Sequence, residues 1–132
     1  MERLILDSGA LIALERGTAE ETDVLPSDAD VAISAVTASE LLVGVELADG
    51  ERRARRHALV EGVLERVEVI PFDLTTARHH AVLLAHARAS GQPRGAHDLQ
   101  IAATARATGR TILTTDRNAF DRLPGVTHRI LR

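Results

Sequence analysis

Four acidic residues stand at positions where an α/β protein gathers its chemistry, at the ends of predicted strands and the starts of predicted helices. Asp7 directly follows one apolar, strand-like run, and Asp116 follows another. Glu40 and Asp98 fall in the first turns of two predicted helices. Because the carboxyl ends of parallel strands share one edge of a sheet, side chains that are far apart in sequence can meet there. We therefore expect these four acids to form one site.

Carboxylates held that close together repel one another, and the pKa values of some of them rise. A hard divalent cation removes this conflict. Mg²⁺ prefers a few carboxylates, several water molecules and the oxygens of a substrate phosphate. Such an ion can generate hydroxide from water and shield the charge of a phosphate under attack. The four acids therefore predict metal-dependent phosphodiester chemistry.

Each acid also has a purely structural explanation. Thr37 and Glu40 fit a capping box at a helix start, and Asp98 could simply favour a helix N-terminus through the dipole. Asp7 could cap the helix that follows it, and Asp116 could cap the short segment after it. The functional interpretation therefore depends on the complete set of four and not on any single residue.

Short β-branched runs alternate with longer helical stretches, which predicts an α/β fold with a mainly parallel central sheet flanked by helices. With 132 residues, we expect a single domain over residues 1–132. Glycines stand where several of the predicted helices should stop. The predicted strands are Leu4–Leu6, Val31–Ile33, Val67–Ile70, Thr111–Leu113 and Thr127–Leu131. The predicted helices are Ser8–Arg16, Thr37–Ala48, Glu51–Arg66, Thr75–Ser90 and Ala96–Thr108.

The four acids lie in segments that occur in a recognisable order. These are Leu6–Ile12, Ser39–Gly44, Asp98–Ala105 and Thr114–Phe120. Together they resemble the four motifs of PIN-domain ribonucleases, and the short chain is similar to the VapC toxins of bacterial VapBC toxin–antitoxin pairs. The resemblance spans nearly the whole chain. Gln100 departs from the pattern, since many relatives have an apolar residue there.

The resemblance implies a Mg²⁺- or Mn²⁺-dependent endoribonuclease that forms a homodimer and is blocked by a cognate antitoxin. It implies that Asp7 and Asp98 are the main metal ligands and that Asp116 completes the site directly or through water. Glu40 would position or deprotonate the attacking water. Two hydroxyl residues, Ser8 and Thr115, would support these acids.

Composition excludes several other classes of function. All 16 basic residues are Arg, so a Walker A loop, Schiff-base catalysis and the lysine-dependent chemistry of receiver domains are poor fits. The absence of Cys excludes a thiolate metal site, and two Phe are too few for an RNA-stacking surface. We see no signal peptide or membrane-length apolar run and expect a cytoplasmic protein. An RNA-processing nuclease without a toxic role and a non-catalytic acidic module remain alternatives.

Other charged residues are weaker candidates. A cluster of four arginines could guide RNA, although a solvated helix face is the more common explanation. These are Arg52, Arg53, Arg55 and Arg56. Arg94 is better placed as a phosphate contact. Asp73 is expected to be a helix N-cap outside the site, and His97 is expected to point away from Asp98. We do not expect metal ligation by the histidines of one helix, His79, His80 and His86.

Overall fold

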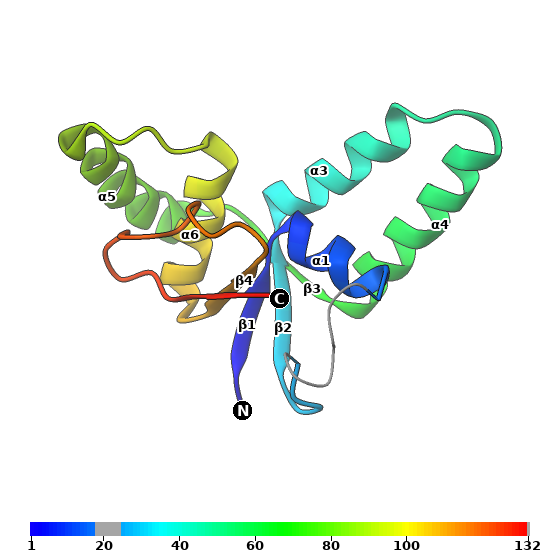
Figure 1. Ribbon diagram of the computed structural model, residues 1–132, viewed down its shortest axis with the longest axis horizontal. Helices are drawn as coiled ribbons and strands as arrows, with labels where there is room; N and C mark the ends of the chain where they lie inside the picture. The colour runs from blue at the N-terminus through cyan, green and yellow to red at the C-terminus, as the bar shows by residue number, and fades with distance from the viewer. Residues whose placement is uncertain (18–24, 132) are drawn as a thin grey trace.

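The computed structural model describes residues 1–17 and 25–131, which form a five-stranded sheet with helices packed on both faces (Figure 1). The strand order is β3-β2-β1-β4-β5, and every pair of neighbours is parallel. The strands are β1 (Arg3–Leu6), β2 (Asp30–Ser34), β3 (Glu68–Ile70), β4 (Thr111–Thr114) and β5 (His128–Ile130). The helices are α1 (Ser8–Glu15), α3 (Ala35–Glu46), α4 (Gly50–Arg66), α5 (Leu74–Ser90) and α6 (Ala96–Thr108).

The predicted α/β class and the order of elements are confirmed, and the sheet is parallel throughout the described residues. The strand predicted over Thr127–Leu131 is shorter, at His128–Ile130. None of the helices that the structure describes is long and apolar enough to cross a membrane.

The alternation of side chains along β1 divides the core between the two faces of the sheet. Leu4 and Leu6 pack with residues of α1, α3 and α4 on one face. Ile5 packs on the other face with Leu83 of α5 and with a row of small and apolar residues of α6. Figure 1 shows α5 and α6 on one side of the sheet, while α3 and α4 form a hairpin that projects on the other. Successive strand residues point to opposite faces of a sheet. The continuous apolar run Leu4–Leu6 therefore places apolar side chains on both faces, and helices cover both.

The register of the central strands places their carboxyl ends level with each other. Leu6 of β1 pairs with Leu113 of β4, and the backbone N–H of Asp7 donates to the carbonyl of Leu113 at 3.2 Å. The residues that follow these two strands therefore begin at the same edge of the sheet.

Three helices begin earlier than predicted, α4 and α5 by one residue and α3 by two. α3 begins at Ala35 and is capped by Ser34, whose hydroxyl accepts a hydrogen bond from the backbone N–H of Thr37 at 3.2 Å. The expected start at Thr37 and the capping box between Thr37 and Glu40 are therefore wrong. Because Ser34 caps the helix, α3 begins two residues earlier than expected. Glu40 therefore lies in the second turn of α3 instead of the first.

Candidate active site

Asp7 is a buried carboxylate that joins α1 to β4. Its Oδ1 atom caps α1 by accepting from the backbone N–H of Ala10 at 2.8 Å. Its Oδ2 atom accepts from the hydroxyl of Thr114. Burial raises the pKa of Asp7 above its ordinary value, and these two hydrogen bonds oppose the rise. The structural role that the sequence offered for Asp7 as a helix cap is thus real, and it coexists with membership of the acidic site.

Asp116 lies just beyond β4, next to the same hydroxyl. The backbone N–H of Asp116 donates to Thr114 Oγ1 at 3.0 Å. The Asp116 carboxylate accepts from the backbone N–H groups of Asn118 at 2.8 Å and Ala119 at 3.1 Å. Asp116 therefore closes a tight turn, as its capping interpretation required. It also lies near Asp7, since both residues bind the Thr114 hydroxyl, and its negative charge contributes to the raised pKa of Asp7.

Asp98 faces the other acids from the first turn of α6. Burial is the main cause of its raised pKa, and the charges of Asp7, Asp116 and Glu40 raise the pKa further, in that order. His97 has the opposite effect. The contacts agree with this: Asp7 and the Asp116 backbone both bind the Thr114 hydroxyl, and Asp98 and Asp116 line one cavity. The residue after Asp7 binds Glu40, so the four acids expected from the sequence lie near one another at one sheet edge.

Glu40 is held from two sides. The Ser8 hydroxyl donates to Glu40 Oε2 at 3.3 Å, and His97 Nδ1 lies 3.4 Å from Glu40 Oε1. The expectation that His97 would point away from Asp98 missed this contact, because its partner comes from α3 and not from its own helix. Only the packing of α3 against α6 brings the two side chains together.

Two glycines let the polar groups approach the backbone closely. A Cβ atom on Gly95 would lie 3.0 Å from Asp98 Oδ2, and one on Gly9 would lie 2.7 Å from Thr115 Oγ1. A side chain at position 9 would therefore force the Thr115 hydroxyl to shift. Of the two expected supporting hydroxyls, Ser8 contacts Glu40, while Thr115 packs against Gly9.

The donor set suits a hard divalent cation. It consists of carboxylate oxygens whose mutual repulsion a positive charge would relieve. Among residues 1–17 and 25–131, however, no three acidic or histidine side chains converge as tightly as a ready-made metal cage. Mg²⁺ usually binds through one or two carboxylates and keeps several waters, so an open arrangement of this kind is compatible with it.

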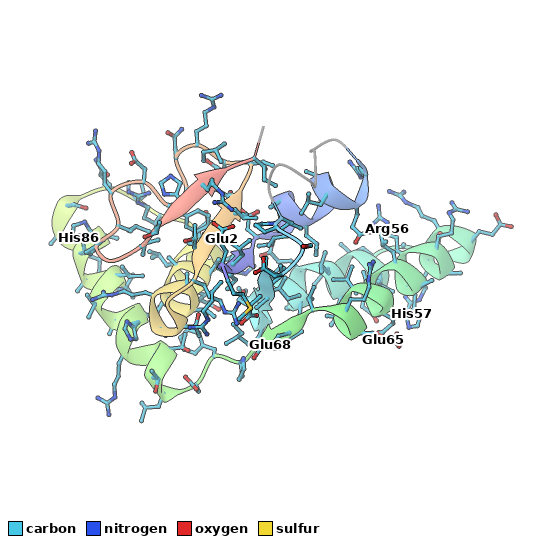
Figure 2. All side chains as sticks on the ribbon, turned by 90° about the horizontal axis from the view of Figure 1, so that it is seen from below. Glu2, Arg56, His57, Glu65, Glu68 and His86 are labelled. Atoms are coloured by element: carbon cyan, nitrogen blue, oxygen red, sulfur yellow. The ribbon has the colours of Figure 1, made fainter. Side chains whose placement is uncertain are left out.

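Other charged candidates are engaged elsewhere. Arg53 pairs with Glu46, and Arg56 donates to the carbonyl of Gly44 at 3.1 Å. Figure 2 shows Arg56 and His57 on the projecting α4, far from His86 on α5. Arg94, the candidate phosphate contact, donates to carbonyl groups of the loop after β4.

A groove of about 240 Å³ runs between α1, α3 and α4 and reaches the acidic site at Glu40. Apolar side chains form most of its surface, and Glu15, Arg16 and Arg56 lie along it. Its apolar lining consists of Leu11, Ile12, Leu41, Leu59, Val60 and Val63.

Comparison with known proteins identifies relatives that share both sequence and fold. Residues 4–126 match the PIN domain family. The chain is 36% identical to ribonuclease VapC5 of Mycobacterium tuberculosis, over 85% of this chain and 82% of that protein. It is 32% identical to ribonuclease VapC1 of Rickettsia felis, over 93% of this chain and 92% of that protein.

Solved structures agree with these matches. A structure of VapBC-5 from Mycobacterium tuberculosis has a chain that is 34% identical, with a TM-score of 0.79 and coverage of 100% of this chain and 99% of that one. A structure of DNA-bound VapBC from Salmonella typhimurium has a chain that is 29% identical, with a TM-score of 0.86 and coverage of 98% of both chains.

Proposed function

The chain belongs to the PIN-domain family, and on this basis we propose that it is an endoribonuclease, the toxin of a VapBC-type toxin–antitoxin pair. It hydrolyses phosphodiester bonds of RNA in the cytoplasm. The relatives of 32–36% identity are named as ribonucleases, and the structural matches of similar identity are toxin–antitoxin complexes.

The observation that carries the proposal is the meeting of four acids that come from four separate segments of the chain. Thr114 links Asp7 to Asp116, Ser8 links the start of α1 to Glu40, and Asp98 shares a cavity with Asp116. The charges of Asp7, Asp116 and Glu40 all raise the pKa of Asp98. A protein maintains such repulsion at a cost in stability, and perturbed acids in one place are typical of a functional site.

The proposal includes dependence on Mg²⁺, with Mn²⁺ as a substitute. Asp7, Asp98 and Asp116 would hold the ion, which supplies Lewis acidity for a water molecule and for the phosphate when bound. Asp7 is oriented for this task by its bonds to Ala10 and Thr114. Glu40 accepts the proton of the attacking water at a carboxylate oxygen, and Ser8 and His97 keep that carboxylate turned toward the site.

The groove between α1, α3 and α4 is the surface that we assign to the antitoxin. Its apolar lining suits an amphipathic helix, and its polar end at Glu40 adjoins the acids. A guanidinium group of the antitoxin could pair there with carboxylates and block the site. We also expect a homodimer, which sedimentation equilibrium of the purified protein would test.

Cleavage of labelled RNA by the purified protein tests the proposed function. We expect cleavage with Mg²⁺, none in excess EDTA, and products with 5′-phosphate and 3′-hydroxyl ends. Undiminished cleavage in EDTA, or products with cyclic phosphate ends, would overturn the proposed mechanism. Expression with and without the neighbouring gene tests the toxin role, because an RNA-processing enzyme would not arrest growth when expressed alone.

A further inference from the structure

Arg94 binds one loop through three carbonyl groups. It lies between α5 and α6, directly before the helix that carries Asp98. Its Nη1 atom donates to the carbonyl oxygens of Asn118 at 2.9 Å and Ala119 at 3.1 Å. Its Nη2 atom donates to the carbonyl of Asp121. A single side chain thus connects the segment before α6 to the loop after β4.

The loop that Arg94 binds is the same turn that Asp116 closes. The N–H groups of Asn118 and Ala119 donate to the Asp116 carboxylate, while the carbonyl groups of these two residues accept from Arg94. These two residues are therefore bound by Asp116 through their N–H groups and by Arg94 through their carbonyl groups. Any shift of this turn changes both sets of hydrogen bonds together.

The backbone beyond the turn is strained. Arg122, which follows Asp121, has a φ of 59°, in the left-handed region that side chains other than glycine rarely adopt. The bond from Arg94 to the Asp121 carbonyl is adjacent to this residue and helps to hold the conformation. Strained backbone of this kind persists where surrounding contacts fix it.

These residues form the walls of one polar cavity of about 530 Å³ beside the acids. Asp98 and the residues before α6 line one wall, and Asp116 with the turn after it lines the other. Arg94 spans the cavity from the first wall to the second. Its bonds therefore link the segment that leads into α6 to the turn that Asp116 closes.

We propose that Arg94 is a positioning residue that holds the turn of Asp116 against the start of α6, and so sets the geometry of Asp98 and Asp116. This inference rests on the proposed nuclease function. A guanidinium group suits this role because two separate nitrogen atoms of its rigid planar fork donate to carbonyl groups at different points of the loop. The three donors of an ammonium group all lie on one nitrogen atom at the end of a flexible stem, so it cannot reproduce this spread.

The test compares Arg94→Met and Arg94→Lys with Arg88→Met, a control that removes an exposed arginine at the end of α5. We expect Arg94→Met to lower RNA cleavage, and Mn²⁺ binding followed by electron paramagnetic resonance, by about 10–100-fold, as for other residues that orient metal ligands. Arg94→Lys should retain only part of the RNA cleavage and of the Mn²⁺ binding. The control Arg88→Met should match the wild type in both.

Combination with Asp116→Asn separates positioning from general stability. If Arg94 acts through Asp116, Arg94→Met should add little to the loss caused by Asp116→Asn alone. Fully additive losses, or wild-type cleavage and Mn²⁺ binding by Arg94→Met, would overturn the inference.

Amide hydrogen exchange keeps this inference distinct from the proposed function. Arg94→Met should accelerate exchange of the Asn118 and Ala119 amides while the core of the sheet exchanges as before. If the wild type cleaves no RNA, the proposed function fails, and the exchange rates still show whether Arg94 holds the turn. Unchanged exchange at these two amides would contradict the positioning role.

Discussion

Asp7 and Thr114 are 107 residues apart in the chain, and the Thr114 hydroxyl donates a hydrogen bond to the Asp7 carboxylate. The same hydroxyl oxygen accepts from the backbone N–H of Asp116. Thr114 is completely buried at the end of β4. One side chain therefore ties two of the site acids to the paired ends of β1 and β4.

Replacement of this hydroxyl should affect both stability and activity. Thr114→Val keeps the shape but leaves the Asp116 N–H without its acceptor and Asp7 Oδ2 without its donor. We expect a loss of about 1–3 kcal/mol in the free energy of unfolding, the usual cost of unpaired buried polar groups. Cleavage should fall as well. Urea unfolding and an RNA cleavage assay measure the two effects, and Thr114→Ser, which retains the hydroxyl, should behave much more like the wild type.

Asp98→Asn should abolish cleavage and leave the fold intact. Asparagine retains the shape of aspartate but not the negative charge that a cation needs. The matched control is Asp73→Asn. Asp73 caps α5 by accepting from the Thr76 N–H at 2.9 Å, and asparagine caps a helix about as well as aspartate does. Equal activity of the two variants would show that Asp98 is not part of the site.

Removal of the Asp7 charge should stabilise the metal-free protein at pH 7. Burial, together with the charges of Asp116 and Glu40, raises the pKa of Asp7, so the ionised form is unfavourable in the folded state. Asp7→Asn should therefore raise the melting temperature in EDTA while lowering cleavage. Changes that relieve such repulsion commonly raise the free energy of unfolding by about 0.5–2 kcal/mol. Added Mg²⁺ should stabilise the wild type more than the variant, because the variant lacks one metal ligand.

The pH dependence of the metal-free protein follows from the same raised pKa values. A carboxyl group whose pKa is higher in the folded state contributes stability below the ordinary Asp value of about 3.9, and this is lost as the pH rises through the folded value. The difference in melting temperature between Asp7→Asn and wild type should therefore grow as the pH rises from that range toward 7. A constant difference, or a lower melting temperature of the variant in EDTA at pH 7, would mean that Asp7 acts only as a helix cap.

A charge in the apolar groove should weaken antitoxin binding. Leu59 of α4 lines the groove and is half exposed. We expect Leu59→Asp to weaken binding of the co-expressed antitoxin by about tenfold or more, since burying an unpaired carboxylate costs more than the ~1.4 kcal/mol that this factor represents. Leu74→Asp, at an exposed leucine of α5 outside the groove, is the control. Isothermal titration calorimetry measures both, and equal affinities would place the antitoxin elsewhere.

The order and type of the elements were predictable from local patterns. The apolar run Leu4–Leu6 and the helical periodicity after position 96 are properties of neighbouring residues, and they need no information about distant contacts. The same patterns placed Asp7 and Asp116 after strands and Asp98 at a helix start. Since parallel strands share one carboxyl edge, the meeting of these acids also followed from the sequence.

The contacts that orient the acids were decided only by the tertiary structure. The pairing of His97 with Glu40 depends on how α3 packs against α6. The hydrogen bonds from Arg94 to carbonyl groups depend on the path of a loop that lies more than 20 residues further along the chain. The start of α3 at Ala35 depends on Ser34, which could cap a helix no less well than Thr37. Local propensity ranks such choices almost equally, so contacts between distant segments determine which one the chain adopts.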